Sequence, residues 1–96
     1  MKCHQKINLQ ELSDSLSIIS QPNRLQIICL LKNGELCVCK IIEALQLKQN
    51  LISHHLNLLK KIWLVTSRRD GKNIFYKLNT KNIQNIQLWL SQIINS

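Results

Sequence analysis

The sequence predicts a mainly α-helical (α+β) fold with about five helices and one β-hairpin, and three observations lead to this fold class. Most of the chain repeats apolar residues at intervals of three and four positions, which is typical of helices packed on one face. One segment near residue 70 instead has two short strand-like runs around a turn signal. The length of 96 residues fits one small domain, 1–96, with a flexible tail at 1–8.

The first two helices are expected on either side of Pro22. Before it, Leu9, Leu12, Leu16 and Ile19 form one apolar stripe. Pro22 suits the first turn of the next helix, where its missing N–H costs nothing. Apolar residues then surround this second helix, which predicts a central buried helix in which Cys29 is a small buried hydrophobic residue. Its apolar set is Leu25, Ile27, Ile28, Cys29, Leu30 and Leu31.

A third short helix is expected over Leu36–Leu47, after a turn at Asn33-Gly34 and before a turn at Gln46–Lys48. It carries Cys37 and Cys39 near its start, where the helix dipole and the neighbouring Lys40 favour thiolates. Such thiols are good ligands for soft ions. On a regular helix, positions two apart point about 200° away from each other. We therefore expect that both cysteines bind one ion only if the first turn is distorted or unformed.

The segment Gln49–Lys61 separates into a polar and an apolar side when its residues are placed at helical steps. His55 lies within the apolar side and is expected to pack in the core. Short hydrogen-bonding side chains followed by lysines are what a helix in the DNA major groove requires. With the short helix and turn before it, this segment predicts a helix-turn-helix. The polar side comprises Gln49, Asn50, Ser53, His54, Asn57, Lys60 and Lys61.

A β-hairpin is expected where Leu64–Arg69 and Asn73–Leu78 flank Asp70-Gly71. It forms a wing beside the helix-turn-helix. Its cations suit the phosphate backbone or an adjacent minor groove. They are Arg68, Arg69, Lys72 and Lys77.

The last helix, Lys81–Ile94 within a dimerisation segment at 79–95, has a broad apolar face that is too large for a monomer surface. It predicts an obligate homodimer. The helix contains no Asp, Glu, His or Cys, which argues against a metal or persulfide site there.

Charge and composition point to a nucleic-acid partner. Thirteen Lys and Arg against five Asp and Glu give a net charge of +8. No stretch is apolar enough to span a membrane, and the N-terminus lacks a secretory signal, so we expect a cytoplasmic protein with reduced cysteines. No catalytic triad, carboxylate pair or phosphate-binding loop is recognisable, which argues against an enzyme.

Across residues 9 to 79 the sequence resembles the ArsR/SmtB family of winged helix-turn-helix repressors. The resemblance implies a dimeric repressor that leaves its operator DNA when a metal or metalloid ion binds. Four motifs carry it: Ser20-Gln21-Pro22-Asn23-Arg24-Leu25, Glu35-Leu36-Cys37-Val38-Cys39, Ile52-Ser53-His54-His55-Leu56 and Arg68-Arg69-Asp70-Gly71-Lys72.

The sequence departs from the pattern of one arsenite-sensing group, which has a third cysteine where this chain has Ile42. Cys3 of the other subunit is the best candidate for a third sulfur, with His4 as a further ligand, as in the cadmium- and lead-sensing branch. Arsenic(III) is satisfied by two or three sulfurs, whereas cadmium and lead want three or four ligands. We therefore expect no obligatory cofactor and arsenite or antimonite as the inducer, with Cd(II) or Pb(II) as the alternative.

Two further hypotheses stay open. One is a redox-sensing repressor in which Cys37 forms a disulfide with Cys39 or with Cys3. The other is a constitutive, nucleoid-type DNA-binding protein, whose affinity for DNA would not respond to thiophilic ions. A thiol oxidoreductase or metal carrier would need a β-α-β pattern around the cysteines, which this helix-rich chain lacks.

Overall fold

The computed structural model describes residues 8–95, so the expected tail at 1–8, with Cys3 and His4, lies almost wholly outside the described residues. Within that range the structure has five helices and a three-stranded antiparallel sheet, as the sequence predicts. The helices are α1 (Leu9–Ile19), α2 (Pro22–Leu31), α3 (Val38–Leu45), α4 (Gln49–Lys61) and α5 (Thr80–Asn95). The strands are β1 (Leu36–Cys37), β2 (Val65–Asp70) and β3 (Asn73–Leu78), in the sheet order β1-β3-β2.

Local capping explains where the first helices begin. The Asn8 side chain accepts a hydrogen bond from the Glu11 N–H at the start of α1. The Gln21 side chain does the same for the Arg24 N–H at the start of α2, with Pro22 as the first helical residue.

Both predicted boundaries of the third helix are wrong. The third helix begins at Val38 and ends at Leu45, instead of spanning Leu36–Leu47, because Leu36 and Cys37 pair with β3 as a two-residue strand. Gln46 then ends α3 in the left-handed conformation, with φ 54°. A two-residue strand leaves no alternating pattern in the sequence, so periodicity could not reveal it.

The hairpin forms as predicted, but its turn lies one residue further along the chain. Asp70 pairs with Asn73, so Gly71 and Lys72 are the two central turn residues. Gly71 has a φ of 64°, a conformation that favours glycine.

The core lies where α1, α2, α3 and α4 meet the base of the hairpin. Its buried residues come from every one of these elements and from the middle of α5. They are Leu12, Ile27, Leu31, Ile41, Ile52, Leu56, Leu59, Leu64, Val65, Tyr76 and Ile86.

The second helix is less buried than predicted. Ile27 and Leu31 face the core, but Leu25 is 45% exposed and Cys29 lies on the exposed side. The prediction that Cys29 is buried is therefore wrong for the single chain. An apolar residue on every side of the helix suggested full burial, whereas the side that carries Leu25 and Cys29 is exposed.

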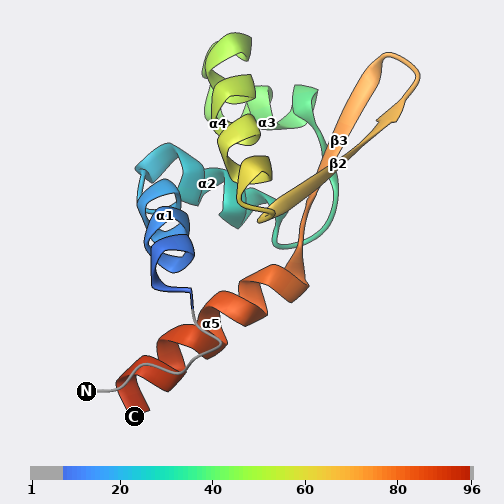
Figure 1. The fold of residues 1–96 in the computed structure, drawn as a ribbon. Helices are drawn as coiled ribbons and strands as arrows, with labels where there is room; N and C mark the ends of the chain where they lie inside the picture. Colours follow the sequence, from blue (N-terminus) through green and yellow to red (C-terminus); the bar gives the residue numbers. More distant parts are fainter. Residues whose placement is uncertain (1–7, 96) are drawn as a thin grey trace.

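Helix α5 and the hairpin project from the body (Figure 1), and the described chain as a whole measures 49 × 22 × 20 Å along its principal axes. Ile86 of α5 is buried, while Leu88 and Ile94 are 54% and 78% exposed. The prediction of an apolar last helix is confirmed, and it leaves an uncovered apolar surface on the single chain.

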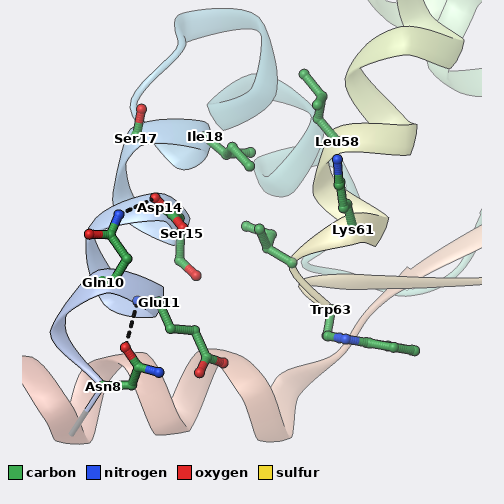
Figure 2. A pocket seen from close by; sticks show the side chains of 11 residues that line it. Asn8, Gln10, Glu11, Asp14, Ser15, Ser17, Ile18, Leu58, Lys61 and Trp63 are labelled. Carbon is green, nitrogen blue, oxygen red and sulfur yellow. Dashed lines mark hydrogen bonds between the residues drawn. The ribbon is translucent and has the colours of Figure 1, made fainter.

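A strained turn joins α4 to β2. Trp63 has a φ of 61° and a side chain that is 67% exposed, beside a groove between α1 and the end of α4 (Figure 2). Two asparagines hold this turn: the Asn79 side chain donates to the Trp63 carbonyl at 2.9 Å, and the Asn82 side chain donates to the Ile62 carbonyl at 2.8 Å.

Candidate thiol site and nucleic-acid interface

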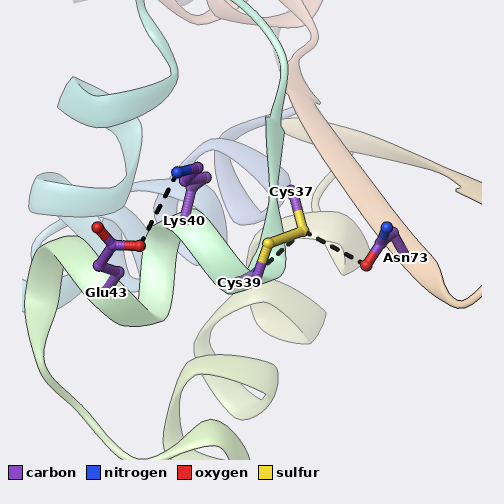
Figure 3. The surroundings of a disulfide bond; sticks show 5 residues. All are labelled: Cys37, Cys39, Lys40, Glu43 and Asn73. Atoms are coloured by element: carbon purple, nitrogen blue, oxygen red, sulfur yellow. Dashed lines mark hydrogen bonds and ion pairs between the residues drawn. A yellow bond between two sulfur atoms is a disulfide. The ribbon is translucent and has the colours of Figure 1, made fainter.

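Cys37 and Cys39 meet at the junction of β1 and α3, where the structure links them by a disulfide (Figure 3). Cys37 is the N-cap of α3, with extended backbone angles (φ −65°, ψ 146°), and only Cys39 lies on the helix. The 200° separation expected on a regular helix therefore does not apply. This agrees with the expectation that both sulfurs can meet only where the first turn is distorted or unformed, because Cys37 precedes the helix. The cysteines were expected to be reduced, whereas this structure joins them by a disulfide.

The two cysteines differ in their surroundings. Cys37 is buried and Cys39 is exposed. The Cys37 sulfur accepts a hydrogen bond from the Cys39 N–H at 3.2 Å, in the role that a Ser or Asp oxygen has at other helix starts. It also lies 3.9 Å from Oδ1 of Asn73, the first residue of β3. Lys40, expected to favour a thiolate, lies 3.9 Å from Glu43 on an exposed face.

The donor set near the pair fits an ion that accepts two sulfurs. In residues 8–95 no group of three or more Cys, His, Asp or Glu side chains lies close enough to hold one ion. Arsenic(III) is compatible with two protein sulfurs, whereas cadmium or lead needs further ligands that the described residues do not offer. Cys3 and His4, the predicted additional ligands, are outside those residues.

Helix α4 has its apolar side chains buried and its polar side chains largely exposed, as the sequence predicts. Ile52, Leu56 and Leu59 are buried, while Gln49, Asn50, His54, Asn57 and Lys60 are exposed and Ser53 is half-buried. Five of the predicted DNA-contacting residues line one shallow hollow: Gln49, Asn50, Ser53, His54 and Asn57. The Lys60 ammonium donates to the Ser67 hydroxyl at 2.8 Å, which joins the end of α4 to the hairpin.

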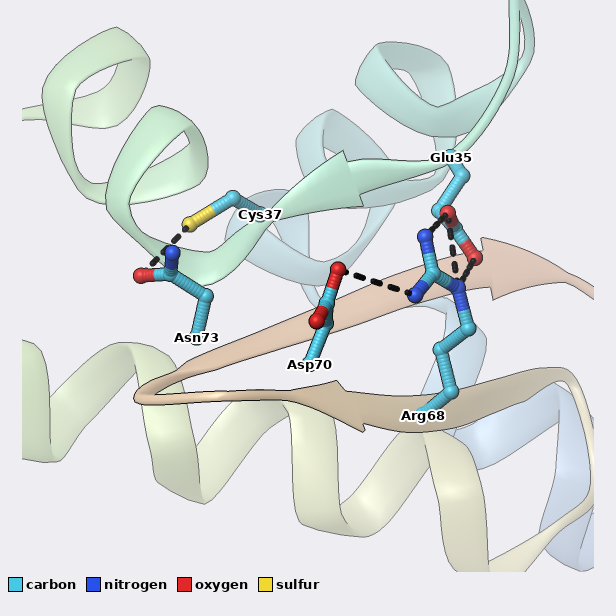
Figure 4. A network of polar contacts seen from close by, with 5 residues as sticks. All are labelled: Glu35, Cys37, Arg68, Asp70 and Asn73. Atoms are coloured by element: carbon cyan, nitrogen blue, oxygen red, sulfur yellow. Dashed lines mark hydrogen bonds and ion pairs between the residues drawn. The ribbon is translucent and has the colours of Figure 1, made fainter.

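One of the predicted wing cations, Arg68, forms contacts within the protein. The Arg68 guanidinium donates to both oxygens of Glu35, with distances of 2.6 to 3.0 Å, and lies 3.9 Å from Asp70 (Figure 4). It also stacks over the Phe75 ring at 4.6 Å. The hydrogen bond from Arg68 lowers the pKa of the Glu35 carboxyl, so Glu35 stays charged and offsets the charge of Arg68.

Arg69, Lys72 and Lys77 are exposed and carry the rest of the positive charge of the wing. Of the predicted wing contacts, Arg69 and Lys72 are exposed, whereas Arg68 forms an ion pair with Glu35.

A second arginine forms a buried contact. Arg24 Nε donates to His55 Nδ1 at 3.2 Å, and its Nη1 donates to the Ile18 carbonyl at 3.1 Å. Burial, followed by the nearby Arg24 and His54, lowers the pKa of His55. The prediction that His55 packs in the core is confirmed, since its side chain is buried. The sequence did not suggest its pairing with Arg24, because 31 positions separate the two residues.

These features define a class of protein: a winged helix-turn-helix regulator with a cysteine pair next to its DNA-reading helix. Residues 21–67 match the family model described as "Bacterial regulatory protein, arsR family". An arsenical resistance operon repressor of Staphylococcus aureus is 44% identical over 73 residues, which cover 76% of this chain and 70% of that protein. The cadmium resistance regulatory protein CadC of Listeria innocua is 40% identical, with 77% of this chain and 63% of that protein covered.

Two solved structures of similar proteins have the same fold. Reduced HlyU from Vibrio cholerae superposes with a TM-score of 0.73 at 33% identity, covering 84% of this chain and 86% of that one. A homodimeric winged helix-turn-helix domain from Mycobacterium bovis superposes with a TM-score of 0.73 at 28% identity, covering 91% and 80%. The chain belongs to the ArsR family. It is a transcriptional repressor of the ArsR/SmtB type and not an enzyme, as predicted.

The helices were also expected to be unable to span a membrane. No helix in residues 8–95 is both long enough and apolar enough to cross a bilayer.

Proposed function

We propose that this protein binds operator DNA as a homodimer in the cytoplasm and leaves it when arsenite or antimonite binds Cys37 and Cys39. The observation that carries the proposal is the meeting of both sulfurs at the β1–α3 junction, next to the recognition helix and the wing. The similar repressor of Staphylococcus aureus is named for arsenical resistance, which supports a metalloid as the inducer.

The DNA contacts are assigned by position. Gln49, Asn50, Ser53, His54 and Asn57 share the exposed hollow of α4 and would face base edges in the major groove. Lys60, Arg69 and Lys72 would contact phosphates, which adds affinity without reading sequence. Arg68 joins them only when it leaves Glu35.

The ion is coupled to DNA through short contacts. Cys37 belongs to β1, which pairs with wing strand β3, and it also caps α3, which packs on α4. An ion bound by both sulfurs would alter the cap of α3 and the contact with Asn73. A small rotation of α4 is enough to misplace two half-sites about 34 Å apart in a dimer.

A redox signal is the second candidate, and the disulfide between Cys37 and Cys39 favours it. The similar HlyU protein was solved in a form described as reduced. In this version, oxidation of the two thiols to the disulfide removes two hydrogens and replaces ion binding as the signal. A cadmium or lead response that recruits Cys3 is the remaining version of the proposal.

The experiment is fluorescence anisotropy of the fully reduced protein on a labelled fragment of its own promoter, titrated with arsenite. We expect release that is lost in Cys37→Ser and retained in Cys29→Ser, which removes an exposed thiol remote from the pair. An intact complex at saturating arsenite would contradict the metalloid assignment.

Parallel titrations separate the alternatives. Release by cadmium that disappears in Cys3→Ser would point to the branch that recruits the tail. Release by mild peroxide, together with a mass loss of two hydrogens that a reductant reverses, would point to the redox version. A complex indifferent to all three reagents would indicate a constitutive DNA-binding protein.

A further inference from the structure

The buried side of helix α4 contains one titratable side chain, that of His55. It is 4% exposed and does not line the hollow that the predicted base-contacting residues share. The His55 Nδ1 accepts a hydrogen bond from Arg24 Nε of α2 at 3.2 Å. Nδ1 therefore carries a lone pair, and the proton of the neutral ring is on Nε2. The Nε2 atom is buried and has no hydrogen-bond partner among the described residues.

A second proton on His55 is incompatible with this contact. The new N–H at Nδ1 would face the N–H of Arg24, so two donors and two positive charges would meet. Arg24 does not lose its proton in a protein, and its Nη1 is held by the Ile18 carbonyl at 3.1 Å. The group that has to move is therefore the imidazole on α4.

The surroundings of His55 do not offset this conflict. The elements that contact α4 include α1, α2, α3 and β2. The charged and titratable groups that act on His55 are Arg24 of α2 and the adjacent His54 of α4, whose ring centre is 5.8 Å away. In the described residues, α1, α3 and β2 add no carboxylate to this set. Burial, followed by these two groups, lowers the pKa of His55, so all three causes favour the neutral ring.

We propose that the contact between Arg24 and His55 is a proton-sensitive link between α4 and the α1–α2 pair, and that acid releases the protein from its operator without an ion at the cysteines. The inference rests on the operator binding of the proposed function, but not on arsenite as the inducer. Only a neutral His55 keeps α4 in the position described above. A protonated His55 leaves Arg24 for solvent and α4 tilts, which misplaces two half-sites about 34 Å apart in a dimer.

The direction of the pH response follows from the two positions of α4. In the first position His55 resists protonation, whereas in the tilted position it is hydrated and its pKa returns to the ordinary 6.5. Operator affinity is therefore complete above pH 6.5 and falls as the pH falls below that value. His54 has the opposite effect, because it is exposed in the hollow of α4 and its protonation adds a cation beside DNA.

The test is fluorescence anisotropy of the reduced, full-length protein on a labelled fragment of its own promoter between pH 8 and pH 5.5, at constant salt and without arsenite. The background variant carries His4→Gln and His54→Gln, which leaves His55 as the remaining histidine. The matched control adds His55→Gln, because a glutamine stays neutral and its oxygen can still accept from Arg24. A repeat with Cys37→Ser shows whether the response needs the cysteine pair.

We expect the background variant to lose operator affinity by about fivefold or more between pH 7.5 and pH 5.5, and the His55→Gln control by less than about twofold. Cys37→Ser should leave this difference unchanged. If His54→Gln alone removes operator binding, the ratio of the parent and His55→Gln affinities at each pH gives the same comparison.

Nuclear magnetic resonance of the histidine rings supplies a measurement that needs no variant at His55. Because a proton on His55 opposes DNA binding, the pKa of His55 in the parent protein should be lower in the operator complex than in the free protein. Equal values in the two states would overturn the inference even if the His55→Gln variant does not fold.

The outcomes separate this inference from the proposed function. The same pH response with and without His55 would overturn the inference, while release by arsenite would still support the proposed function. Loss of the helical circular dichroism signal over the same pH range would also overturn it, because release would then be unfolding. An acid response that disappears in Cys37→Ser would overturn it in favour of the cysteine pair. Absence of operator binding at every pH would remove the proposed function together with the inference.

Discussion

Two arginines join distant parts of the chain, and they do so in opposite environments. Arg24 reaches from α2 to the buried His55 of α4 and to the Ile18 carbonyl. Arg68 reaches from β2 to Glu35, next to the strand that carries Cys37, and lies in solvent. Without Arg24, its acceptors would be shielded from water and would lack a hydrogen-bond donor, whereas Glu35 would be hydrated without Arg68. We therefore expect the Arg68–Glu35 pair to contribute less to the free energy of unfolding than the contact between Arg24 and His55, although the distance in the Arg68–Glu35 pair is shorter.

The largest expected effect is that of Arg24→Ala. It leaves the His55 Nδ1 and the Ile18 carbonyl without a donor, so the free energy of unfolding should fall by about 2 kcal/mol. Urea unfolding followed by circular dichroism measures it. Arg68→Ala is the matched control and should leave the midpoint close to that of the parent, because its pair is exposed. Equal losses in both variants would break the comparison.

The pH dependence of stability should differ between the two contacts. The pKa of His55 lies below its usual 6.5 because of burial, so its contribution is complete above pH 6.5 and is lost as the pH falls below that value, where the unfolded chain binds the proton first. Glu35, whose pKa is lowered by the hydrogen bond from Arg68, loses its contribution only below pH 4.5. Unfolding curves collected between pH 8 and pH 4 check this order. In His55→Gln, the free energy of unfolding should no longer fall with pH just below pH 6.5. If it still falls there, another group is responsible for the pH dependence in that range.

A smaller effect concerns the salt dependence of DNA binding. Glu35→Gln frees Arg68, so the plot of log affinity against log salt should steepen by up to about one. Arg69→Ala should make the same plot shallower by about one, because Arg69 is exposed and is predicted to contact a phosphate. Anisotropy on one duplex between low and moderate salt distinguishes the two. If Glu35→Gln leaves the slope unchanged, Arg68 does not approach a phosphate even when it is free.

For the side chains predicted to contact bases, the expected change is a loss of discrimination between the operator and other duplexes. Asn50→Ala and Ser53→Ala should weaken binding to the operator by about 1 to 3 kcal/mol and bring it closer to binding on a random duplex. Lys72→Ala should weaken both duplexes alike. The same loss on both duplexes for all three variants would contradict the separation into reading and positioning residues.

The sequence was sufficient for elements that have a strong repeating pattern. The bounds of α4 were predicted to the residue, because its thirteen positions divide into a polar and an apolar side at helical spacing. The hairpin was found from its glycine turn, and Cys37 and Cys39 from their spacing next to α4. The residues of α4 predicted to contact bases share one hollow, because helical geometry alone places them on one side.

Features that depend on which elements meet in space were missed. Strand β1 exists only because Leu36 and Cys37 find partners in β3. The exposure of Cys29 depends on the absence of a neighbouring element on that side of α2 in the single chain. The ion pair of Arg68 joins residues 33 positions apart, and no local pattern announces such a pair. A cavity beside the two cysteines likewise combines α3, α4 and β3.

Trp63 also gives the protein a built-in optical label. Its indole is 67% exposed at the end of α4, whereas Trp89 on α5 is partly covered. Iodide should therefore quench the emission of Trp63 more strongly than that of Trp89. Movement of α4 and burial of α5 by another chain would then give two separate fluorescence signals, and no dye would have to be attached to a cysteine.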